Sequence, residues 1–352
     1  MKSSSESNDE LSRCSVAIIE ALGKFDACLY PDTIHWKLNL TQHDKLYHYC
    51  SLEAFYSIIE SNCFWLSHPK FMNDLSEHKY YAIVVRDCIE KYIEKVAHND
   101  KSRSFLELIY AEICNRIKSS SIFDKNEYSL LPFIACFSSD GDNLPMWSMY
   151  TGKNVGISIG LDFTDKAYFA SYLGTDQKEI EISPFRIVPD SCFSDMIYEK
   201  TRVELAISAY LDHMKSFYCN SIDNFSNGKK YTIDNINEFI SNESASWLML
   251  KSIKLKNINF TYEQETRFEL SRYNNADIKY RVKDKFIVPY IEYPPKTKEN
   301  EKPLIPISSI MISPNAEEPE LVIDSIRGFL KMKGYSIDKI DIRQSDIPFK
   351  PR

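Results

Sequence analysis

Apolar residues along the chain change their spacing several times, and each spacing predicts a type of secondary structure. From Cys14 to Leu29 they recur every three or four positions, which is typical of a helix with one buried face. The same spacing returns in 80–96, 105–117, 194–218 and 235–256. These segments are therefore predicted to be helices, and residues 1–12 before the first helix are predicted to be a frayed tail.

Short apolar runs bounded by turn residues separate these helices and predict strands. The predicted strands are Leu46–Tyr49, Phe64–Leu66, Phe133–Phe137, Gly156–Phe163, Glu179–Val188, Phe260–Leu270, Phe286–Tyr293 and Leu304–Ile312. Strands that mix irregularly with clustered helices indicate an α+β fold rather than a doubly wound sheet.

Two helix ends carry clear capping signals. Ser51 is a good N-cap, and Glu53 behind it places a negative charge in the first turn of a helix whose apolar face includes Phe55. A last helix, Pro319–Met332, is predicted to end before Gly334, which suits the C′ position.

Composition narrows the class of protein. The 352 residues are 43% apolar and 26% charged, which is ordinary globular composition. The formal charge of −7 comes without a large basic block, which disfavours duplex nucleic acid as a bulk electrostatic partner. A local basic face remains open, and a solvated helix face is the simpler interpretation; its members would be Lys229, Lys230, Lys251, Lys254 and Lys256.

The nine cysteines are scattered and mostly lie in apolar runs, and no pair forms a CxxC motif. We therefore expect reduced, buried thiols and neither a disulfide nor a structural zinc site. The polar start of the chain does not resemble a secretory signal, and no window of about 18 apolar residues predicts a membrane span. A cytoplasmic protein is the expectation.

The sequence contains no Walker loop, GxGxxG, GxSxG, HExxH or kinase signature, so the common nucleotide and hydrolase folds are disfavoured. Two other segments contain candidate functional residues. His48 lies between Tyr47 and Tyr49 on a predicted strand, although a satisfied core histidine would look the same. Glu263, Glu265 and Arg267 would share one strand face, where the carboxylates could perform separate tasks, or could form a solvated strand edge.

Other candidate segments are less specific. Asp74, Glu77 and His78 lie in an oxygen-rich loop that could bind a divalent metal, but turn and capping roles explain the loop more simply. Trp147 and Tyr150 could form an aromatic pocket wall, or Trp147 could belong to the core.

Taken in order, these segments resemble a bacterial family, domain of unknown function family 2971, from about residue 45 to the C-terminus. The matching positions are Tyr47-His48-Tyr49, Asn73-Asp74 with Glu77, Cys136-Phe137-Ser138, Trp147 with Tyr150, Gly156 with Gly160, Glu263-Gln264-Glu265-Thr266-Arg267, Ile307 with Ile310 and Pro314, and Ser345 with Pro348. Cys50 departs from the pattern, because the family more often has threonine there.

The family in turn looks like ADP-ribosyltransferases, by analogy of fold. The resemblance implies split mixed or antiparallel sheets in one catalytic domain, 45–352, with helical insertions at about 80–118 and 194–256, and an N-terminal helical extension, 1–44. It also implies that NAD is the substrate and that no metal is needed.

The resemblance assigns roles to individual residues. Glu265 would stabilise the oxocarbenium-like state formed when nicotinamide leaves, and Glu263 would act on the acceptor. Cofactor contacts would come from His48, Tyr49, Ser51, Ser138, Trp147, Tyr150 and Arg267. His48 and Glu265 should then line one pocket.

Several alternatives stay open at this point. The acceptor could be a protein, a nucleic acid or a small molecule, and water as acceptor would make the chain a NAD glycohydrolase. A nucleotide-binding or interaction module without turnover is the rival from another class. The sequence does not decide whether the role is that of a toxin, an anti-phage effector or a housekeeping enzyme.

Overall fold

The structure is a computed structural model, and its described residues cover most of the chain. They are 7–30, 43–72, 76–98, 100–119, 131–151, 155–162, 191–225, 231–270, 275–283, 285–293 and 304–348. The predicted strand Glu179–Val188, the loop residues Asn73 and Asp74, and Lys229 and Lys230 lie outside this part of the chain.

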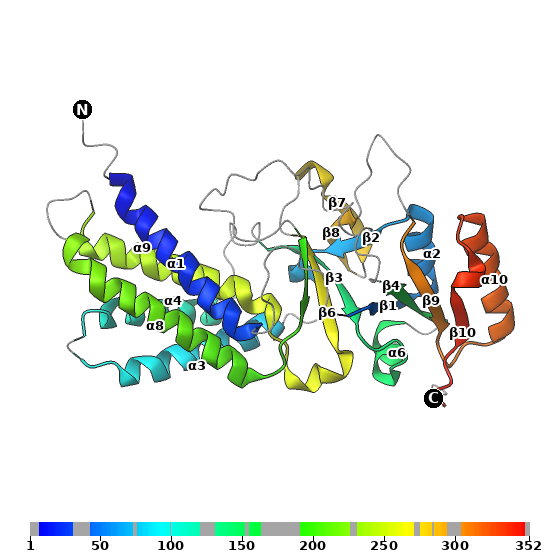
Figure 1. Ribbon diagram of the computed structural model, residues 1–352, viewed down its shortest axis with the longest axis horizontal. Coiled ribbons are helices and arrows are strands. Elements are labelled where there is room, and N and C mark those ends of the chain that lie inside the picture. The colour runs from blue at the N-terminus through cyan, green and yellow to red at the C-terminus, as the bar shows by residue number, and fades with distance from the viewer. Residues whose placement is uncertain are drawn as a thin grey trace.

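Long helices gather at one end of the molecule and form a helical lobe (Figure 1). They are α1 (Ser7–Leu29), α3 (Ser76–Lys95), α4 (Arg103–Lys118), α8 (Lys200–Phe225) and α9 (Ile233–Leu250). Their apolar faces share one core, which includes Phe25, Phe105 and Tyr210. Helix α1, which lies in the predicted N-terminal helical extension, packs along α8 and contributes to this core.

A mixed sheet forms the rest of the molecule (Figure 1). Its strands are β1 (Lys45–Ser51), β2 (Phe64–Ser67), β3 (Phe133–Ser138), β4 (Gly156–Asp162), β5 (Ser191–Asp195), β6 (Glu265–Leu270), β7 (Lys279–Lys283), β8 (Phe286–Tyr293), β9 (Ile307–Ile312) and β10 (Asp341–Gln344). The order is β10-β9-β4-β1-β3-β2-β8-β7, with β6 paired to β3 and β5 to β6. Neighbours are antiparallel except β10 and β9, so the chain has an α+β architecture with a mixed sheet.

The sheet divides at β3. Strand β6 pairs with β3 along its whole length, so β1 and β2 must share the opposite edge of β3. They do so at its two ends, because β1 pairs at Ser138 and β2 pairs at Ile134. Between these two points none of the described strands pairs with that edge of β3, and the described sheet is open there.

Shorter helices cover the two faces of the sheet. Helices α2 (Leu52–Ser61) and α10 (Pro319–Met332) pack on one face and close a second apolar core, which contains Phe55, Phe137 and Ile310. Helix α6 (Leu144–Tyr150) packs on the other face against β1.

The predicted helix ends of α2 and α10 are confirmed. The side chain of Ser51 accepts a hydrogen bond from the backbone N–H of Ala54 at 3.2 Å and caps α2. Helix α10 has the predicted bounds, and Gly334 follows its end with φ of +90°, a conformation that glycine adopts without strain.

Several predicted bounds were wrong. The predicted strand Phe260–Leu270 begins only at Glu265, because 258–263 form a 3₁₀ turn that ends with Gln264 at φ of +43°. The helix expected over 235–256 ends at Leu250 and continues as a 3₁₀ turn, Lys251–Lys254. Ser194 belongs to β5, so the helix expected over 194–218 begins later.

The lysines around this turn do not form a solvated helix face. Lys251 pairs with Asp26 at 2.6 Å, Lys254 pairs with Glu269, and Lys256 is 5% exposed. The prediction failed because the chain leaves the helix at Leu250, after which the lysine side chains point toward different carboxylates on neighbouring elements.

Two general expectations concern thiols and membranes. Eight cysteines whose side chains the structure describes are free thiols, namely Cys14, Cys28, Cys50, Cys63, Cys88, Cys114, Cys136 and Cys219. Within the described ranges, none of the helices combines the length and apolar character that crossing a bilayer requires.

Candidate functional site

A large cleft lies where the sheet divides. Its volume is about 1070 Å³, slightly above the roughly 300–1,000 Å³ that is common for small-molecule and cofactor sites. Side chains of β1, β2, β3, β6 and β7 line it, together with residues of α6. Because the sheet is open between β1 and β2, the cleft borders side chains from both faces of the sheet.

His48 occupies the opening in the sheet. Its Nδ1 lies 2.9 Å from the carbonyl oxygen of Cys136, on the stretch of β3 that pairs with β6 but has no described strand on its other edge. A carbonyl only accepts, so Nδ1 carries the proton and Nε2 is left as an acceptor. Burial lowers the pKa of His48, which keeps the ring neutral near pH 7. The histidine thus replaces a missing strand contact and borders the cleft.

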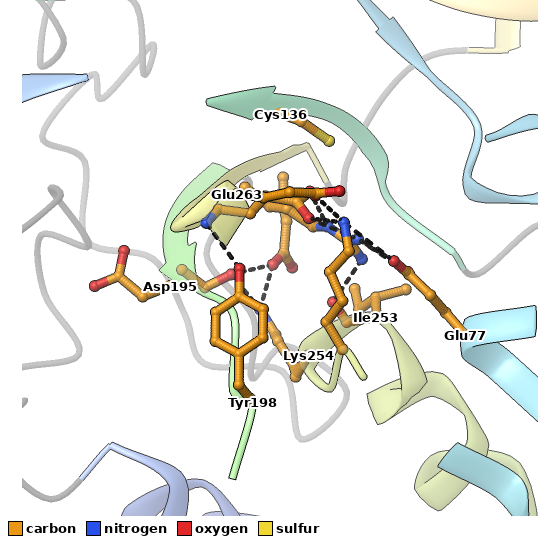
Figure 2. A network of polar contacts seen from close by, with 12 residues as sticks. Glu77, Cys136, Asp195, Tyr198, Ile253, Lys254 and Glu263 are labelled. Carbon is orange, nitrogen blue, oxygen red and sulfur yellow. Dashed lines mark hydrogen bonds and ion pairs between the residues drawn. The ribbon is translucent and has the colours of Figure 1, made fainter. Parts of the chain in front are cut away.

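A buried cluster of charged side chains, the carboxylate cluster, forms another part of the cleft wall (Figure 2). Its members are Glu77, Glu263, Glu265, Lys256 and Arg267. Lys256 is at its centre, with its Nζ 2.7 Å from Glu265 Oε2 and 3.4 Å from Glu77 Oε1, and in contact with Glu263 Oε2. Each of these carboxylates is less than a tenth exposed. Glu77 reaches the cluster from α3 at the edge of the helical lobe (Figure 2).

Arg267 adds a second positive charge to this cluster. Its Nε donates to Glu265 Oε1 at 2.7 Å, and its terminal nitrogen lies 2.9 Å from Glu77 Oε2. It also donates to the carbonyl oxygen of Ile253 at 2.9 Å. Buried charges are tolerated when they are paired and hydrogen-bonded in this way.

The two carboxylates named from the sequence have opposite pKa shifts. Burial by itself would raise the pKa of Glu265, but Arg267 and Lys256 outweigh burial and bring it down to about 2. For Glu263, burial is the strongest effect and raises the pKa above its ordinary value, against the opposing attraction of Lys256. Neighbouring carboxylates with pKa values moved apart are typical of acid–base sites.

Local backbone geometry explains how both carboxylates reach Lys256. Gln264 between them is in the left-handed region, so the chain turns sharply before β6 begins. Glu265 then pairs with Ser138 on β3, and its backbone N–H donates to the hydroxyl of Tyr198 at 2.9 Å (Figure 2). The carboxylates therefore do not share a strand face as expected, but the turn brings Glu263 to the same lysine.

The aromatic residues named from the sequence divide into two groups. Tyr150 lines the cleft, and its hydroxyl donates to Glu263 Oε1 at 2.9 Å. Tyr49 also borders the cleft, while its hydroxyl donates to the carbonyl oxygen of Asp140 at 2.9 Å. Trp147 is 2% exposed and packs edge-on against Tyr49, so it belongs to the core.

The two serines have mainly structural contacts. Ser138 is fully buried, and its hydroxyl accepts from the backbone N–H of Asp140 at 3.1 Å. Ser51 borders the cleft while it caps α2.

His48 and Glu265 border the same cleft but come from alternate faces of the sheet. Tyr47, Ser138 and Glu265 lie side by side in the strand register. Side chains alternate along a strand, so His48 next to Tyr47 points to the other face. The sequence predicted that both residues line one pocket, but not that they come from opposite faces of the sheet.

Glu77 and His78 from the proposed metal loop have other partners. Glu77 pairs with Arg267, and His78 Nδ1 lies 2.7 Å from the hydroxyl oxygen of Ser252. Among the residues that the structure describes, no group of three or more histidine, cysteine, aspartate or glutamate side chains is arranged to hold a metal ion.

Sequence reasoning missed Lys256 and Glu77 as members of the carboxylate cluster. Glu77 is 190 positions from Arg267 in the sequence, and a lysine that follows a helix is ordinarily expected to be solvent-exposed. One signal was present, because Lys256 precedes Glu263 and Glu265 by only seven and nine positions.

Comparison with known proteins supports the family resemblance in part. Residues 146–268 match the family described as "Protein of unknown function (DUF2971)". The matched segment runs from α6 to β6 and so includes Tyr150, Lys256 and both carboxylates. No curated protein and no solved structure gives a significant match to the chain.

Proposed function

We propose that the chain is a NAD-dependent ADP-ribosyltransferase that transfers ADP-ribose to an acceptor still to be identified. The observation that supports the proposal is the pair of carboxylates in the cleft wall with oppositely shifted pKa values. Cleavage of the bond between nicotinamide and ribose needs one fixed negative charge and one group that handles a proton.

Glu265 would supply the fixed negative charge. As nicotinamide leaves, the electron pair of the broken bond goes to the ring nitrogen of nicotinamide, and positive charge develops on the ribose. A carboxylate with a pKa of about 2 is ionised at every working pH and stabilises that charge without reorganising.

Glu263 would handle the proton of the acceptor. The acceptor attacks the ribose carbon, and its proton passes to Glu263, whose raised pKa makes it a better base than an ordinary glutamate. Tyr150 holds this carboxylate in place through its hydroxyl.

His48 and the aromatic side chains of the cleft would hold the rest of the substrate. The unprotonated Nε2 of His48 can accept a hydrogen bond from a ribose hydroxyl, and Tyr49 or Tyr150 can contact a flat ring. NAD would serve as a substrate, and the chemistry requires no metal.

A binding module without turnover is the second candidate. The observation that favours it is that both oxygens of Glu265 are already paired, Oε1 with Arg267 and Oε2 with Lys256. Catalysis would need the substrate ribose to share one of these oxygens with its cation.

The test is incubation of the purified protein with labelled NAD, with and without cell lysate. We expect nicotinamide release, label in an acceptor fraction when lysate is present, and no effect of a metal chelator. Nicotinamide release without any labelled acceptor would indicate a NAD glycohydrolase. Binding of NAD without nicotinamide release would contradict the proposal and favour the binding module.

A further inference from the structure

Arg281 on β7 is a cation in the cleft wall whose surroundings differ from those of Lys256 and Arg267. Its guanidinium carbon lies 5.0 Å from the ring centre of Trp65 and 5.6 Å from that of Tyr290. One terminal nitrogen donates to the hydroxyl of Ser67 at 3.1 Å. These cation–π contacts with two rings restrict the position of the guanidinium.

No carboxylate pairs with Arg281 within the described ranges, and its buried Nε has no hydrogen-bond partner there. Burial lowers the pKa of Arg281, as expected for a cation that is desolvated without a nearby anion. Lys256 and Arg267, by contrast, each contact at least two carboxylates. A partly buried donor without a partner carries a desolvation cost that a bound anion would remove.

Arg281 faces the same side of the sheet as the carboxylate cluster. Ser67 pairs with Ile134 on β3, and Ile134 pairs with Glu269, two residues from Arg267 on the same strand face. Since β3 alone separates β2 from β6, Ser67 is about two strand spacings, roughly 10 Å, from Glu269. Glu265 lies four residues further along β6, so the Ser67 end of the cleft is on the order of 17 Å from Glu265.

We propose that Arg281 forms an anion-binding subsite for a phosphate group of the cleft ligand. A planar guanidinium offers two parallel donors to two phosphate oxygens. Lys283, two residues further along β7, also borders the cleft and adds positive charge at this end.

The charges of the cleft would orient such a ligand. The carboxylate cluster contains Glu77, Glu263 and Glu265 against Lys256 and Arg267, so its formal charge is negative and it repels phosphate. This orientation rests on the proposed function: the cationic nicotinamide ring would lie at the carboxylate end of the cleft and the phosphates at the Arg281 end.

The test is equilibrium binding of inorganic phosphate, pyrophosphate, ADP-ribose and nicotinamide riboside to the wild-type chain and to Arg281→Gln. Charged hydrogen bonds contribute about 1.5–3 kcal/mol, so we expect Arg281→Gln to weaken ADP-ribose and pyrophosphate binding by roughly tenfold or more. Nicotinamide riboside has no phosphate, and its affinity should not change. Arg281→Lys should restore only part of the affinity, because it keeps the charge and loses the planar donors.

Arg327→Gln is a matched control, because Arg327 is an exposed arginine on α10 whose side chain is 49% exposed. It should bind all four probes like the wild type. Binding of inorganic phosphate and pyrophosphate alone would show a general phosphate site, whereas tighter binding of ADP-ribose would show that the subsite serves a nucleotide. Equal binding of the phosphate probes to wild type and Arg281→Gln, or no binding to wild type, would overturn the subsite.

These results can be separated from a failure of the proposed function. Phosphate binding that depends on Arg281, without nicotinamide release from NAD, would keep the subsite and remove the transferase. NAD turnover with an unchanged KM in Arg281→Gln would keep the transferase and remove the subsite.

Discussion

At the scale of single residues, the cleft is governed by the way in which two neighbouring glutamates are paired. Glu265 contacts both Arg267 and Lys256, whereas Glu263 contacts Lys256 and the hydroxyl of Tyr150. The additional guanidinium is the difference between them, and it explains why the pKa shifts have opposite directions.

The first prediction separates the roles of these carboxylates. Glu265→Gln removes a charge interaction that matters chiefly in the transition state. Turnover should therefore fall by at least about a hundredfold, the usual effect of losing one group that stabilises transition-state charge, while NAD binding largely survives. Glu263→Gln should impair transfer to the acceptor and leave slow hydrolysis of NAD by water. Nicotinamide release and acceptor labelling are measured separately for each variant. Equal loss of both activities in both variants would show that the carboxylates act as one unit.

The second prediction concerns pH. The pKa of Glu263 is raised above its ordinary value of 4.5, so this group gains its proton earlier than a normal glutamate as the pH falls. If Glu263 acts as the base, transfer should decline on the acidic side through a limb that lies above pH 4.5. Glu265, with a pKa of about 2, should contribute no limb between pH 4 and 9. A pH profile of kcat for Glu263→Gln that keeps the acidic limb would contradict this assignment.

At the scale of elements, the glycines of β4 allow its neighbours to approach closely. A Cβ on Gly156 would overlap the side chain of Thr151, a buried residue just after α6. A Cβ on Gly160 would overlap the hydroxyl of Ser309 and touch the ring of Tyr47. The position of α6, which carries Tyr150 to the cleft, therefore depends on the missing side chain at Gly156, and the packing of β4 between β1 and β9 depends on the missing side chain at Gly160.

The third prediction tests this close approach. Gly156→Ala should destabilise the fold by about 1–3 kcal/mol, because overpacking forces neighbouring atoms to shift. Gly23→Ala is the matched control, since no atom of the described residues lies within 4 Å of a Cβ at Gly23 in α1. There the same substitution should stabilise the helix by about 0.5–1 kcal/mol. Chemical denaturation measures both, and a destabilisation of the same size in the two variants would exclude the proposed overlap.

At the scale of the whole molecule, the carboxylate cluster joins the helical lobe to the sheet. Glu77 comes from α3, Lys256 from the segment after α9, and Glu265 from β6. Lys254 with Glu269 and Lys251 with Asp26 add further ion pairs around the same segment. The lobe and the sheet thus meet at a cluster of buried charges, and the cleft lies beside that contact.

The fourth prediction is that Lys256 is required for this contact. Lys256→Met would leave three carboxylates with Arg267 alone, and removal of one partner from a buried ion pair costs about 3–5 kcal/mol. The loss should be smaller at pH 5 than at pH 8, because the pKa of Glu263 is already raised and protonation removes a repulsive charge. Denaturation at both pH values measures this. Lys200→Met, at a lysine whose side chain is 43% exposed, should change stability by less than about 0.5 kcal/mol.

Local signals in the sequence determined the parts of the fold that depend on near neighbours. The cap at Ser51 and the bounds of α10 follow from residues within one or two turns, so they could be predicted. The early start given to β6 was wrong because a left-handed residue at Gln264 interrupts a run that looks extended. The hydrophobic pattern does not predict a positive φ at a glutamine.

The chemistry of the site was only partly determined by the sequence. Residue types and their order picked out His48, Glu263 and Glu265, and the structure brings all three to the cleft. The sequence did not show whether those carboxylates are solvated or buried, because alternating charges look alike in both situations. Only the tertiary structure decided this, since Lys256 and Glu77 reach β6 through a long-range contact between the lobe and the sheet. The separation of their pKa values follows from that contact and from burial.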